Sequence, residues 1–373
     1  MTVRSLVIVL DGCGVGAAPD WNLYGDEEGA NTLLHVMESG NWKVPHLTAL
    51  GLFPWLEATG LEGFAIEHGS LQPMGFGKDS VTGHWEMMGA VVQQPFPTFP
   101  NGFPASFVEA LEERIGRPLL GNVVGSGTEI LSQFGAESLE RELPIVYTSA
   151  DSVLQIAAHE DVIPVSKLYE WCRLARELSS GKNGVQRVIA RPFTGDCAPF
   201  RRTDARRDFV LSPPSNLCDT IGDVVGIGVV AELFDHRGFR TTPRTGSNSE
   251  HEEALLAAMQ EQDSMFIFAN FEDFDMRFGH RNDPIGFGKC LEEFDITLHK
   301  VLASLQDSDE LVLTADHGND PLDFSTDHTR EYVPFVKLKA SSERSITNLG
   351  TQQGLAHVGR AVATHLSVSF NFD

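Results

Sequence analysis

The sequence lacks the features of an exported or membrane-spanning protein. Its 373 residues include five widely spaced cysteines that form no C-x-x-C pair: Cys13, Cys172, Cys197, Cys218 and Cys290. This arrangement indicates neither a disulfide framework nor a thiolate zinc site. No run of roughly 18 apolar residues occurs, and the first apolar run ends at Asp11 without a signal-peptide cleavage pattern. We therefore expect a cytoplasmic protein that does not span a membrane.

Positive charge is also scarce, because 28 lysines and arginines stand against 52 aspartates and glutamates, for a formal net charge of -24. Nucleic acids and anionic membranes bind basic surfaces, so we expect neither as a partner. A small phosphorylated metabolite remains compatible with this composition if metal ions or a local arginine cluster hold its phosphate. The length favours two domains over one core.

Three short apolar runs end in acidic or histidine residues. They are Ser5 to Leu10 before Asp11, Met265 to Asn270 before Asp273 and Asp275, and Glu310 to Ala315 before Asp316 and His317. Runs of this length without alternation predict buried parallel strands. A helical period between Ile285 and Gln306 predicts the crossover between the second and third strands. Because ligands bind at the carboxyl ends of such strands, we expect the polar endings to converge.

The proline content divides the chain. Prolines punctuate short segments from about residue 95 to residue 215, which is typical of turns and irregular connections. We therefore predict an α/β core formed by residues 1–95 and 216–373, interrupted by an inserted cap domain over residues 96–215.

The segments that follow the strands predict a metal centre. Asp275 precedes His280, and Asp316 and His317 precede His328. A lone Asp or His is usually a solvated loop residue or a satisfied core group, but such a concentration at strand ends is harder to explain structurally. Carboxylate and imidazole ligands without thiolate suit Mn²⁺, Zn²⁺ or Fe²⁺, and six ligands suffice for two ions. Paired ions clamp the oxygens of a phosphoryl transfer, which indicates phosphate or sulfate ester chemistry.

A glycine pattern offers a different interpretation. Gly12, Gly14 and Ala17 match a dinucleotide-binding fingerprint directly after a strand. The residues that follow, Ala18 to Asn22, predict a loop, whereas the fingerprint requires a helix there. Asp11 would also place a carboxylate beside the pyrophosphate. An NAD-dependent oxidoreductase is therefore a minor alternative, and a metal-binding role for Asp11 is preferred.

Hydroxyl groups lie at the start of a predicted helix between Lys78 and Gly89. Asp79 or Ser80 could cap a helix that begins near Thr82. A hydroxyl there lies at the positive end of the helix dipole, where phosphoryl groups bind well, and a metal ion would activate it as a nucleophile. The structural alternative is that Ser80 and Thr82 merely cap the helix.

The assembled segments resemble the phosphopentomutases, a family of the alkaline phosphatase superfamily. The matching stretches include V-I-V-L-D-G at 7–12, G-K-D-S-V-T-G-H-W-E at 77–86, S-G-T-E-I at 126–130, D-F-D-M-R-F-G-H-R-N-D-P at 273–284 and T-A-D-H-G-N-D-P at 314–321, with T-D-H-T-R-E-Y-V-P at 326–334. The resemblance covers nearly the whole chain, and its motifs are specific in order and spacing. It implies an alkaline-phosphatase-like doubly wound core with a cap that closes over a sugar phosphate.

The resemblance also implies the chemistry. By match, one Mn²⁺ would take Asp11, Asp316 and His317 near a phosphorylated Thr82, and a second Mn²⁺ would take Asp275, His280 and His328. Phosphothreonine would give its phosphoryl group to the 1- or 5-phosphate of ribose or deoxyribose, which forms a bisphosphate that reorients and returns the other phosphate. A sugar bisphosphate would then serve as activator.

Substrate contacts follow by the same match, with one departure. The resemblance assigns sugar contacts to Ser149, Asp151 and Val153, and contacts with the distal phosphate to Arg191, with Arg206 nearby. Five arginines lie between residues 191 and 207 against two aspartates, a local excess suited to phosphate. Where the family usually has a lysine expected to contact the substrate phosphate, this chain has Val229, so that cation is missing.

Two alternatives therefore stay open beside a pentose mutase. One is a paralogous mutase or phosphatase with another phosphorylated substrate, such as a metal-dependent phosphoglycerate mutase. The other is a metabolite-binding protein without catalysis, in which Thr82 would never carry phosphate.

Overall fold

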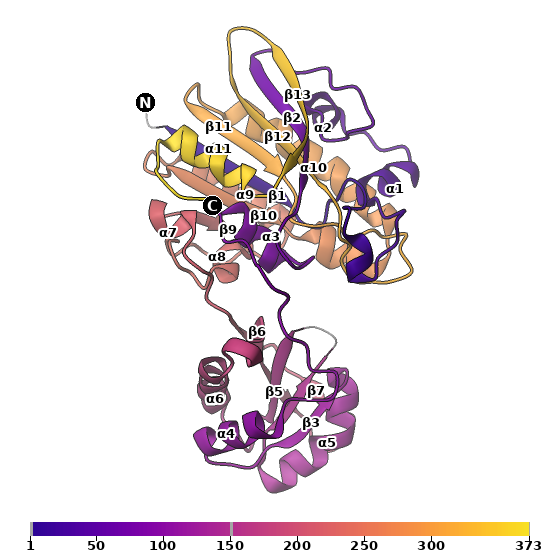
Figure 1. The fold of residues 1–373 in the computed structure, drawn as a ribbon, viewed down its shortest axis with the longest axis vertical. Helices are drawn as coiled ribbons and strands as arrows, with labels where there is room; N and C mark the ends of the chain where they lie inside the picture. Colours follow the sequence, from indigo (N-terminus) through magenta and orange to yellow (C-terminus); the bar gives the residue numbers. More distant parts are fainter. Residues whose placement is uncertain (1–2, 150–151, 373) are drawn as a thin grey trace. The chain divides into compact units, whose positions relative to one another are not determined.

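A computed structural model describes residues 3–149 and 152–372, and it divides the chain into two compact units (Figure 1). The core unit comprises Met1–Gln94 and Pro213–Asp373, and the inserted unit comprises Pro95–Ser212. Asp151, which the resemblance assigns to sugar binding, lies outside the described residues.

A mixed sheet forms the centre of the core unit. Across the described residues it has seven strands in the order β13-β2-β12-β11-β1-β10-β9. The parallel half consists of β11 (Asp309–Thr314), β1 (Arg4–Leu10), β10 (Phe266–Phe271) and β9 (Val225–Ile227). The other half consists of β12 (Val333–Ala340) and β2 (Phe64–Gln72), which pair antiparallel, and β13 (Ser345–Gln353), which is parallel to β2.

The apolar runs form the three central strands, as predicted. β1, β10 and β11 are buried along their whole length, so both faces of the sheet are covered, which explains why the runs do not alternate. The predicted crossover is α10 (Pro284–Ser304), which connects β10 to β11. Pro284 occupies its first turn and the Asp283 side chain accepts a hydrogen bond from the Gly286 amide, a typical helix start.

The other helices of the core unit lie on the two faces of this sheet and at its edges. They are α1 (Thr32–Glu38), α2 (Pro45–Leu50), α3 (Ser80–Met87), α7 (Leu217–Ile221), α8 (Val230–Leu233), α9 (Asn248–Gln260) and α11 (His357–Leu366). Between Gly12 and the short 3-10 helix Trp21–Tyr24 the chain forms a loop. That loop agrees with the prediction and not with a dinucleotide-binding helix.

Helix α3 begins at Ser80, two residues earlier than predicted. Asp79 is its N-cap and accepts hydrogen bonds from the amides of Val81 and Thr82. These contacts satisfy two of the amides that every helix start leaves unpaired. Residues 81–87 are buried, and Ser80 is partly exposed. The first helical residue therefore presents a hydroxyl at the N-terminal end of α3.

The inserted unit has a sheet of its own. Its strands are β3 (Leu120–Val124), β4 (Ile145–Thr148), β5 (Val153–His159), β6 (Arg187–Thr194) and β7 (Arg201–Arg202), with β8 (Arg207–Val210) also paired to β6. Its helices are α4 (Ala105–Ile115), α5 (Gly127–Arg141) and α6 (Val165–Leu178). One apolar cluster includes residues of α4 and α6, and a second includes residues of α5.

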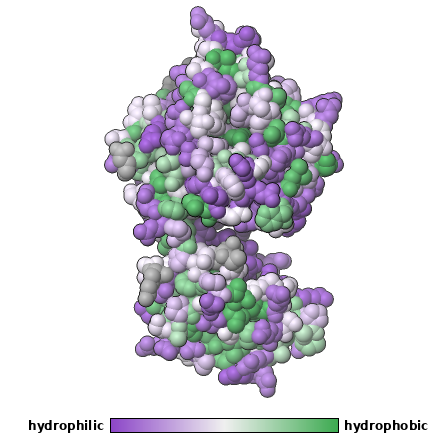
Figure 2. Space-filling model, turned by 45° about the vertical axis from the view of Figure 1, so that its right-hand side comes forward, coloured by the Kyte–Doolittle hydropathy of each residue, from purple (hydrophilic) through white to green (hydrophobic). Residues whose placement is uncertain are grey.

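The surface agrees with the acidic composition. Hydrophilic residues dominate the visible face of the core unit in Figure 2, with hydrophobic residues scattered between them. In the described parts of the chain, no helix combines the length and apolar character needed to cross a membrane. All five cysteines are free thiols, and only Cys197 is exposed.

Candidate metal centre

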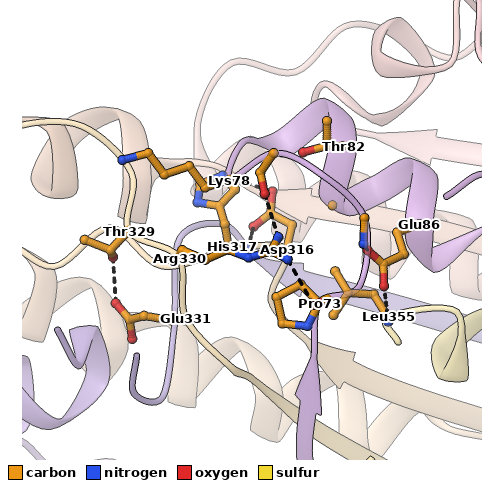
Figure 3. Close-up of a pocket in the computed structure, with 13 residues that line it drawn as sticks. Pro73, Lys78, Thr82, Glu86, Asp316, His317, Thr329, Arg330, Glu331 and Leu355 are labelled. Carbon is orange, nitrogen blue, oxygen red and sulfur yellow. Dashed lines mark hydrogen bonds and ion pairs between the residues drawn. The ribbon is translucent and has the colours of Figure 1, made fainter. Parts of the chain in front are cut away.

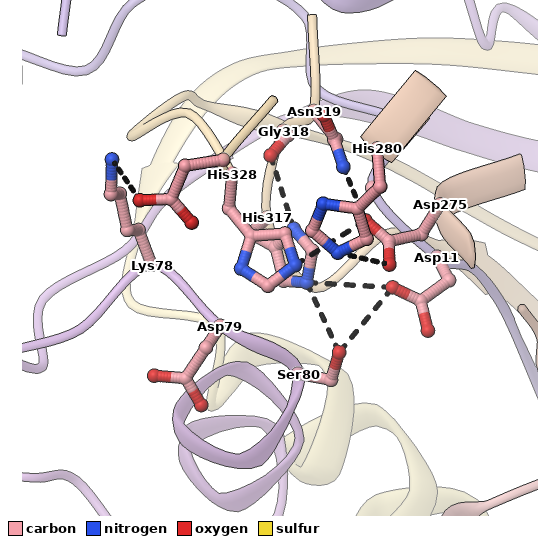
Figure 4. A network of polar contacts seen from close by, with 12 residues as sticks. Asp11, Lys78, Asp79, Ser80, Asp275, His280, His317, Gly318, Asn319 and His328 are labelled. Carbon is pink, nitrogen blue, oxygen red and sulfur yellow. Dashed lines mark hydrogen bonds and ion pairs between the residues drawn. The ribbon is translucent and has the colours of Figure 1, made fainter. Parts of the chain in front are cut away.

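The predicted ligands gather at the carboxyl ends of the central strands. Asp11 follows β1, and Asp316 and His317 follow β11. The remaining three come from two further segments. Asp275 lies in a π-helical turn (Phe274–Phe278) after β10, His280 in the next turn, and His328 in the loop before β12. Figure 4 shows the three imidazole rings beside the carboxylates of Asp11 and Asp275. The convergence expected from the strand endings is therefore present.

Each histidine turns its Nε2 atom toward a carboxylate. His317 Nε2 lies 3.4 Å from Asp11 Oδ1 and 3.4 Å from Asp316 Oδ2. Asp275 receives the other two rings, with His280 Nε2 3.2 Å from Oδ2 and His328 Nε2 3.4 Å from Oδ1. The outer nitrogens of two rings contact backbone carbonyls, His317 Nδ1 at Gly318 O (3.1 Å) and His280 Nδ1 at Thr326 O (2.6 Å). An outer N–H bonded to a carbonyl leaves Nε2 free as a metal ligand.

The pKa shifts in the centre show that its carboxylates need positive charge beside them. Burial, together with the charges of Asp316 and Asp275, raises the pKa of Asp11 well above its usual value. Burial opposes ionisation of Asp275 too, but His328 and His280 bring its pKa well below the ordinary range. Asp275 in turn overcomes burial and raises the pKa of His328 to about 9. The carboxylates thus depend on neighbouring cations for their charge.

Divalent metal ions fit this donor set. Two groups of ligand atoms lie close enough to hold an ion, with the atoms of each group within 4.8 Å of one another: Asp11, Asp316 and His317, and Asp275, His317 and His328. Asp316 Oδ2 is buried and accepts no well-formed hydrogen bond, although His317 Nε2 and His84 Nδ1 lie 3.4 and 3.3 Å from it, so this oxygen is available to a cation. His280 contacts Asp275 but belongs to neither group, so the second group differs from the predicted set of Asp275, His280 and His328.

Side chains that are not themselves candidate ligands contact the ligand carboxylates through amide and imidazole groups. Asn270 Nδ2 donates to Asp11 Oδ2 at 2.6 Å, and Asn319 Nδ2 donates to Asp275 Oδ1 at 2.7 Å. His84 Nδ1 lies 2.8 Å from the Ser80 carbonyl oxygen and 3.3 Å from Asp316 Oδ2. Such supporting bonds orient metal ligands. The sequence interpretation assigned no role to these three residues, although all lie within or beside the motifs.

The hydroxyl that faces the ligands belongs to Ser80. Its Oγ atom lies 3.2 Å from His317 Nε2 and 3.5 Å from Asp11 Oδ1 (Figure 4). Thr82 Oγ1 instead donates to the Asp79 carbonyl oxygen at 3.0 Å and lies 3.1 Å from Asp79 Oδ2. We expected the Thr82 hydroxyl to lie beside the ligands, but the hydroxyl that contacts them is that of Ser80. The Thr82 hydroxyl completes the capping box of α3.

A small pocket lies beside the same helix. Thr82, Asp316 and His317 line it together with Lys78 and Arg330 (Figure 3). Its volume of about 10 Å³ accommodates about one water molecule. The cations around it are already paired, because Lys78 Nζ lies 2.7 Å from Asp26 Oδ1 and Arg330 binds Asp20. The pocket is therefore too small for a sugar phosphate.

The inserted unit contains the predicted arginine cluster. Arg191 Nε donates to Gln155 Oε1 at 3.0 Å, and the charges of Arg206 and Arg202 add to burial in lowering the pKa of Arg191. The same three guanidinium groups partly offset the burial that raises the pKa of Tyr147. Arg206 is paired with Asp208. Neighbouring cations that lower the pKa of Arg191 would also favour an anion beside it.

The other predicted substrate residues lie at neighbouring strand ends. Ser149 directly follows β4 and is partly exposed, whereas Val153 begins β5 and is buried. The guanidinium carbon of Arg207 lies 5.3 Å from the ring centroids of Tyr169 and Phe209, so this arginine has a structural role in packing against the two rings.

The environment of Val229 is acidic. Its backbone amide donates to Glu272 Oε2 at 3.2 Å, and His251 Nε2 lies 3.4 Å from Glu272 Oε1. Two arginines that follow Val229 in the sequence are held by other carboxylates, Arg237 by Asp219 and Arg240 by Asp223.

Comparisons with known proteins agree with this geometry. The family model described as Metalloenzyme superfamily matches residues 3–370. A phosphopentomutase of Dictyoglomus thermophilum is 43% identical to this chain over 98% of its length and 95% of the relative's. Phosphopentomutases of Acetivibrio thermocellus and Herpetosiphon aurantiacus are 43% and 44% identical, over 99% and 96% of this chain and 97% and 94% of their own. The chain belongs to the phosphopentomutase family.

This membership makes the protein a phosphomutase, which is an isomerase, and it supports the use of divalent metal. The solved PH0037 protein from Pyrococcus horikoshii is similar in fold, with a TM-score of 0.51 and 15% identity over the whole of both chains. The predicted α/β, alkaline-phosphatase-like fold class is confirmed.

Proposed function

We propose that this phosphopentomutase homologue interconverts the 1- and 5-phosphates of ribose or deoxyribose, and that Ser80 carries the phosphoryl group. The names of the curated relatives support the reaction. The contacts of Ser80 Oγ with Asp11 and His317 support the choice of residue, and they are the observation that carries the proposal. Phosphothreonine at Thr82, expected from the resemblance, is the competing assignment.

The proposed cycle begins with phosphorylated Ser80. The bond between phosphorus and Ser80 Oγ breaks, a bond forms from phosphorus to the free hydroxyl oxygen of the sugar phosphate, and the proton lost by that hydroxyl is balanced by one gained at the released Ser80 Oγ. The resulting bisphosphate turns around and returns its other phosphate to Ser80 Oγ. The sugar then leaves as the isomeric monophosphate, so phosphate is conserved. A sugar bisphosphate would prime an unphosphorylated enzyme by the reverse of the first transfer.

Two divalent ions, which we propose are Mn²⁺, would be held by Asp11, Asp316 and His317 and by Asp275, His328 and His317 or His280. When bound, they would neutralise charge on the transferring phosphoryl group. The chain itself orients the reacting hydroxyl. Ser80 is the first residue of α3, its carbonyl oxygen contacts His84, and Asp79 caps the helix behind it. The N-terminal end of the helix favours negative charge at that position.

The arginine cluster of the inserted unit suits the phosphate that is not transferred. Arginine holds phosphate through two parallel hydrogen bonds, and Arg191 is only partly buried, with Arg202 and Arg206 nearby. We propose that these arginines bind that phosphate and that Ser149 contacts the sugar. Val153, which is buried, would then contribute through its backbone.

Another phosphorylated sugar is a second candidate substrate, favoured by the surroundings of Val229. The carboxylate of Glu272 bonds to the amide at this position, and a carboxylate accepts hydrogen bonds from hydroxyl groups but repels phosphate. A sugar that presents a hydroxyl here would be preferred over one that presents a phosphate.

Turnover of ribose 1-phosphate to ribose 5-phosphate, with Mn²⁺ and a catalytic amount of sugar bisphosphate, tests the proposal. We expect conversion by the unaltered protein and by Thr82→Val, and none by Ser80→Ala. A panel of other sugar monophosphates and the phosphoglycerates decides between the substrates. Efficient turnover of a panel member with no turnover of pentose phosphates would overturn the pentose assignment.

A further inference from the structure

Glu331 is a fully buried carboxylate that the proposed reaction does not use. It lies three residues after His328, and none of its surface is exposed. Its Oε2 atom accepts hydrogen bonds from the amides of Gly16 and Thr32, each at 3.0 Å. Its Oε1 atom accepts from the hydroxyls of Thr32 at 2.7 Å and Thr329 at 2.6 Å. A buried charge with this many donors is fully satisfied, unlike most isolated buried carboxylates.

The donors come from two loops that carry candidate ligands and from Thr32, the first residue of α1. Gly16 belongs to the loop after Asp11, and Thr329 directly follows His328. A third loop, after His317, approaches through glycine: a Cβ atom added to Gly318 would lie 2.3 Å from Glu331 Oε1, and one added to Gly14 would lie 2.3 Å from Oε2. The side chain of Glu331 therefore fills a space between these loops that only glycine leaves open.

A chain of hydrogen bonds connects Glu331 to Asp275, the candidate ligand that follows β10. The Thr32 hydroxyl, which donates to Glu331, accepts a hydrogen bond from the Asn319 amide at 3.0 Å. The Asn319 side chain donates to Asp275 Oδ1 at 2.7 Å. Glu331 is thus connected to every loop that carries a candidate ligand from β1, β10 or β11, and it contacts none of the ligands itself.

We propose that Glu331 is a positioning residue of the metal centre, which sets the spacing of the loops that hold the two ions. This inference rests on the proposed function, because it requires metal ions at that centre. Loss of a supporting partner typically weakens metal binding by about 10- to 100-fold without removing a ligand. The four donors also explain why the residue is acidic, since they are satisfied by a carboxylate and not by an amide, which would turn an NH₂ group toward some of them.

Ionisation of Glu331 fits this role. Burial raises its pKa to about 7, and the hydrogen bonds from Thr329, Thr32 and Gly16 oppose that shift. The carboxylate form that accepts all the donors is therefore accessible at neutral pH.

The test measures Mn²⁺ affinity by calorimetry in Glu331→Gln and Thr32→Val. Glu331→Gln keeps the shape and removes the charge, and Thr32→Val removes only the hydroxyl that relays Glu331 to Asn319. A matched control is Glu310→Gln. Glu310 is also a buried carboxyl group whose burial raises its pKa, but it lies at the start of β11, at the opposite end from Asp316.

We expect at least tenfold weaker Mn²⁺ binding in Glu331→Gln, a smaller loss in Thr32→Val and unchanged affinity in Glu310→Gln. Turnover by Glu331→Gln should return at saturating Mn²⁺, because no catalytic group is removed. Folded variants that bind Mn²⁺ like the unaltered protein would overturn the inference alone. If Glu331→Gln does not fold, unchanged affinity in Thr32→Val overturns it. Failure of the unaltered protein to bind Mn²⁺ would contradict the proposed function as well.

Discussion

Replacing Arg330 with methionine should destabilise the core unit and loosen the loop that precedes Ser80. The Arg330 side chain is almost fully buried and donates to both carboxylate oxygens of Asp20, at 3.1 and 2.9 Å. It also donates to the carbonyl oxygens of Gly77 at 2.7 Å and Pro73 at 3.0 Å. These carbonyls belong to the segment that leads into α3. Arg330 thus connects the His328 loop to the start of the helix that carries Ser80.

The expected loss in free energy of unfolding follows from the polar groups that Arg330→Met leaves without a donor. Asp20 is 32% exposed and can be rehydrated, so its contribution is small. The Pro73 carbonyl loses its donor in a buried setting and the Gly77 carbonyl in a partly buried one, and each unsatisfied buried group costs about 1–3 kcal/mol. A total of about 2–4 kcal/mol is reasonable on this basis. For a unit of this size, that loss corresponds to a fall in Tm of about 4–16 °C.

Thermal unfolding followed by circular dichroism measures the effect, and Arg344→Met is the matched control. Arg344 pairs with Glu62 across 3.2 Å, but both side chains are more than half exposed. Such a pair contributes about 0–1 kcal/mol. A fall in Tm below about 2 °C in Arg330→Met, or an equal fall in both variants, would refute the reasoning from burial.

Two further predictions concern the ions and the arginine cluster. Adding Mn²⁺ to chelator-treated protein at 100 times its Kd should stabilise the fold by about 2.7 kcal/mol per site, seen as a rise in Tm, whereas an unchanged Tm would argue against metal binding by the folded chain. Arg191→Met should raise the KM for sugar phosphate by about 10-fold or more, since a hydrogen bond to a charged group contributes about 1.5–3 kcal/mol. Arg201 is exposed, and Arg201→Met should leave this KM unchanged. An equal rise in KM in both variants would contradict a specific role for Arg191.

The fold could be predicted where hydrophobic pattern and chain order act locally. β1, β10, β11 and α10 follow from continuous apolar runs and a 3.6-residue period. β13 could not be found in this way. It is exposed at the edge of the sheet over most of its length and has a bulge between Asn348 and Thr351, so its sequence has little apolar periodicity to detect.

The site could be predicted at the level of residue types but not of side-chain directions. Ser80 and Thr82 are two residues apart, and successive helical residues turn by about 100°, so their side chains leave α3 in different directions. Which of them contacts the ligands depends on how the start of α3 packs against the strand ends, which local sequence does not specify. The sequence interpretation placed the start near Thr82, whereas the structure has it at Ser80.

The contacts of Glu331 could not be predicted from sequence patterns. Its donors, Gly16, Thr32 and Thr329, are separated along the chain by up to about three hundred residues. The motif T-D-H-T-R-E-Y contains the carboxylate, but nothing local indicates that it lies between two glycines. Such roles emerge only when the loops are brought together by the sheet.

The location of the transferred phosphate tests the central claim most directly. The unaltered protein, Ser80→Ala and Thr82→Val are each incubated with Mn²⁺ and a sugar bisphosphate, digested, and analysed by mass spectrometry of the peptide that spans residues 78–88. We predict one phosphate on Ser80 in the unaltered protein and in Thr82→Val, and none in Ser80→Ala. Phosphate on Thr82 that persists in Ser80→Ala, or no phosphate on this peptide in any sample, would contradict the account.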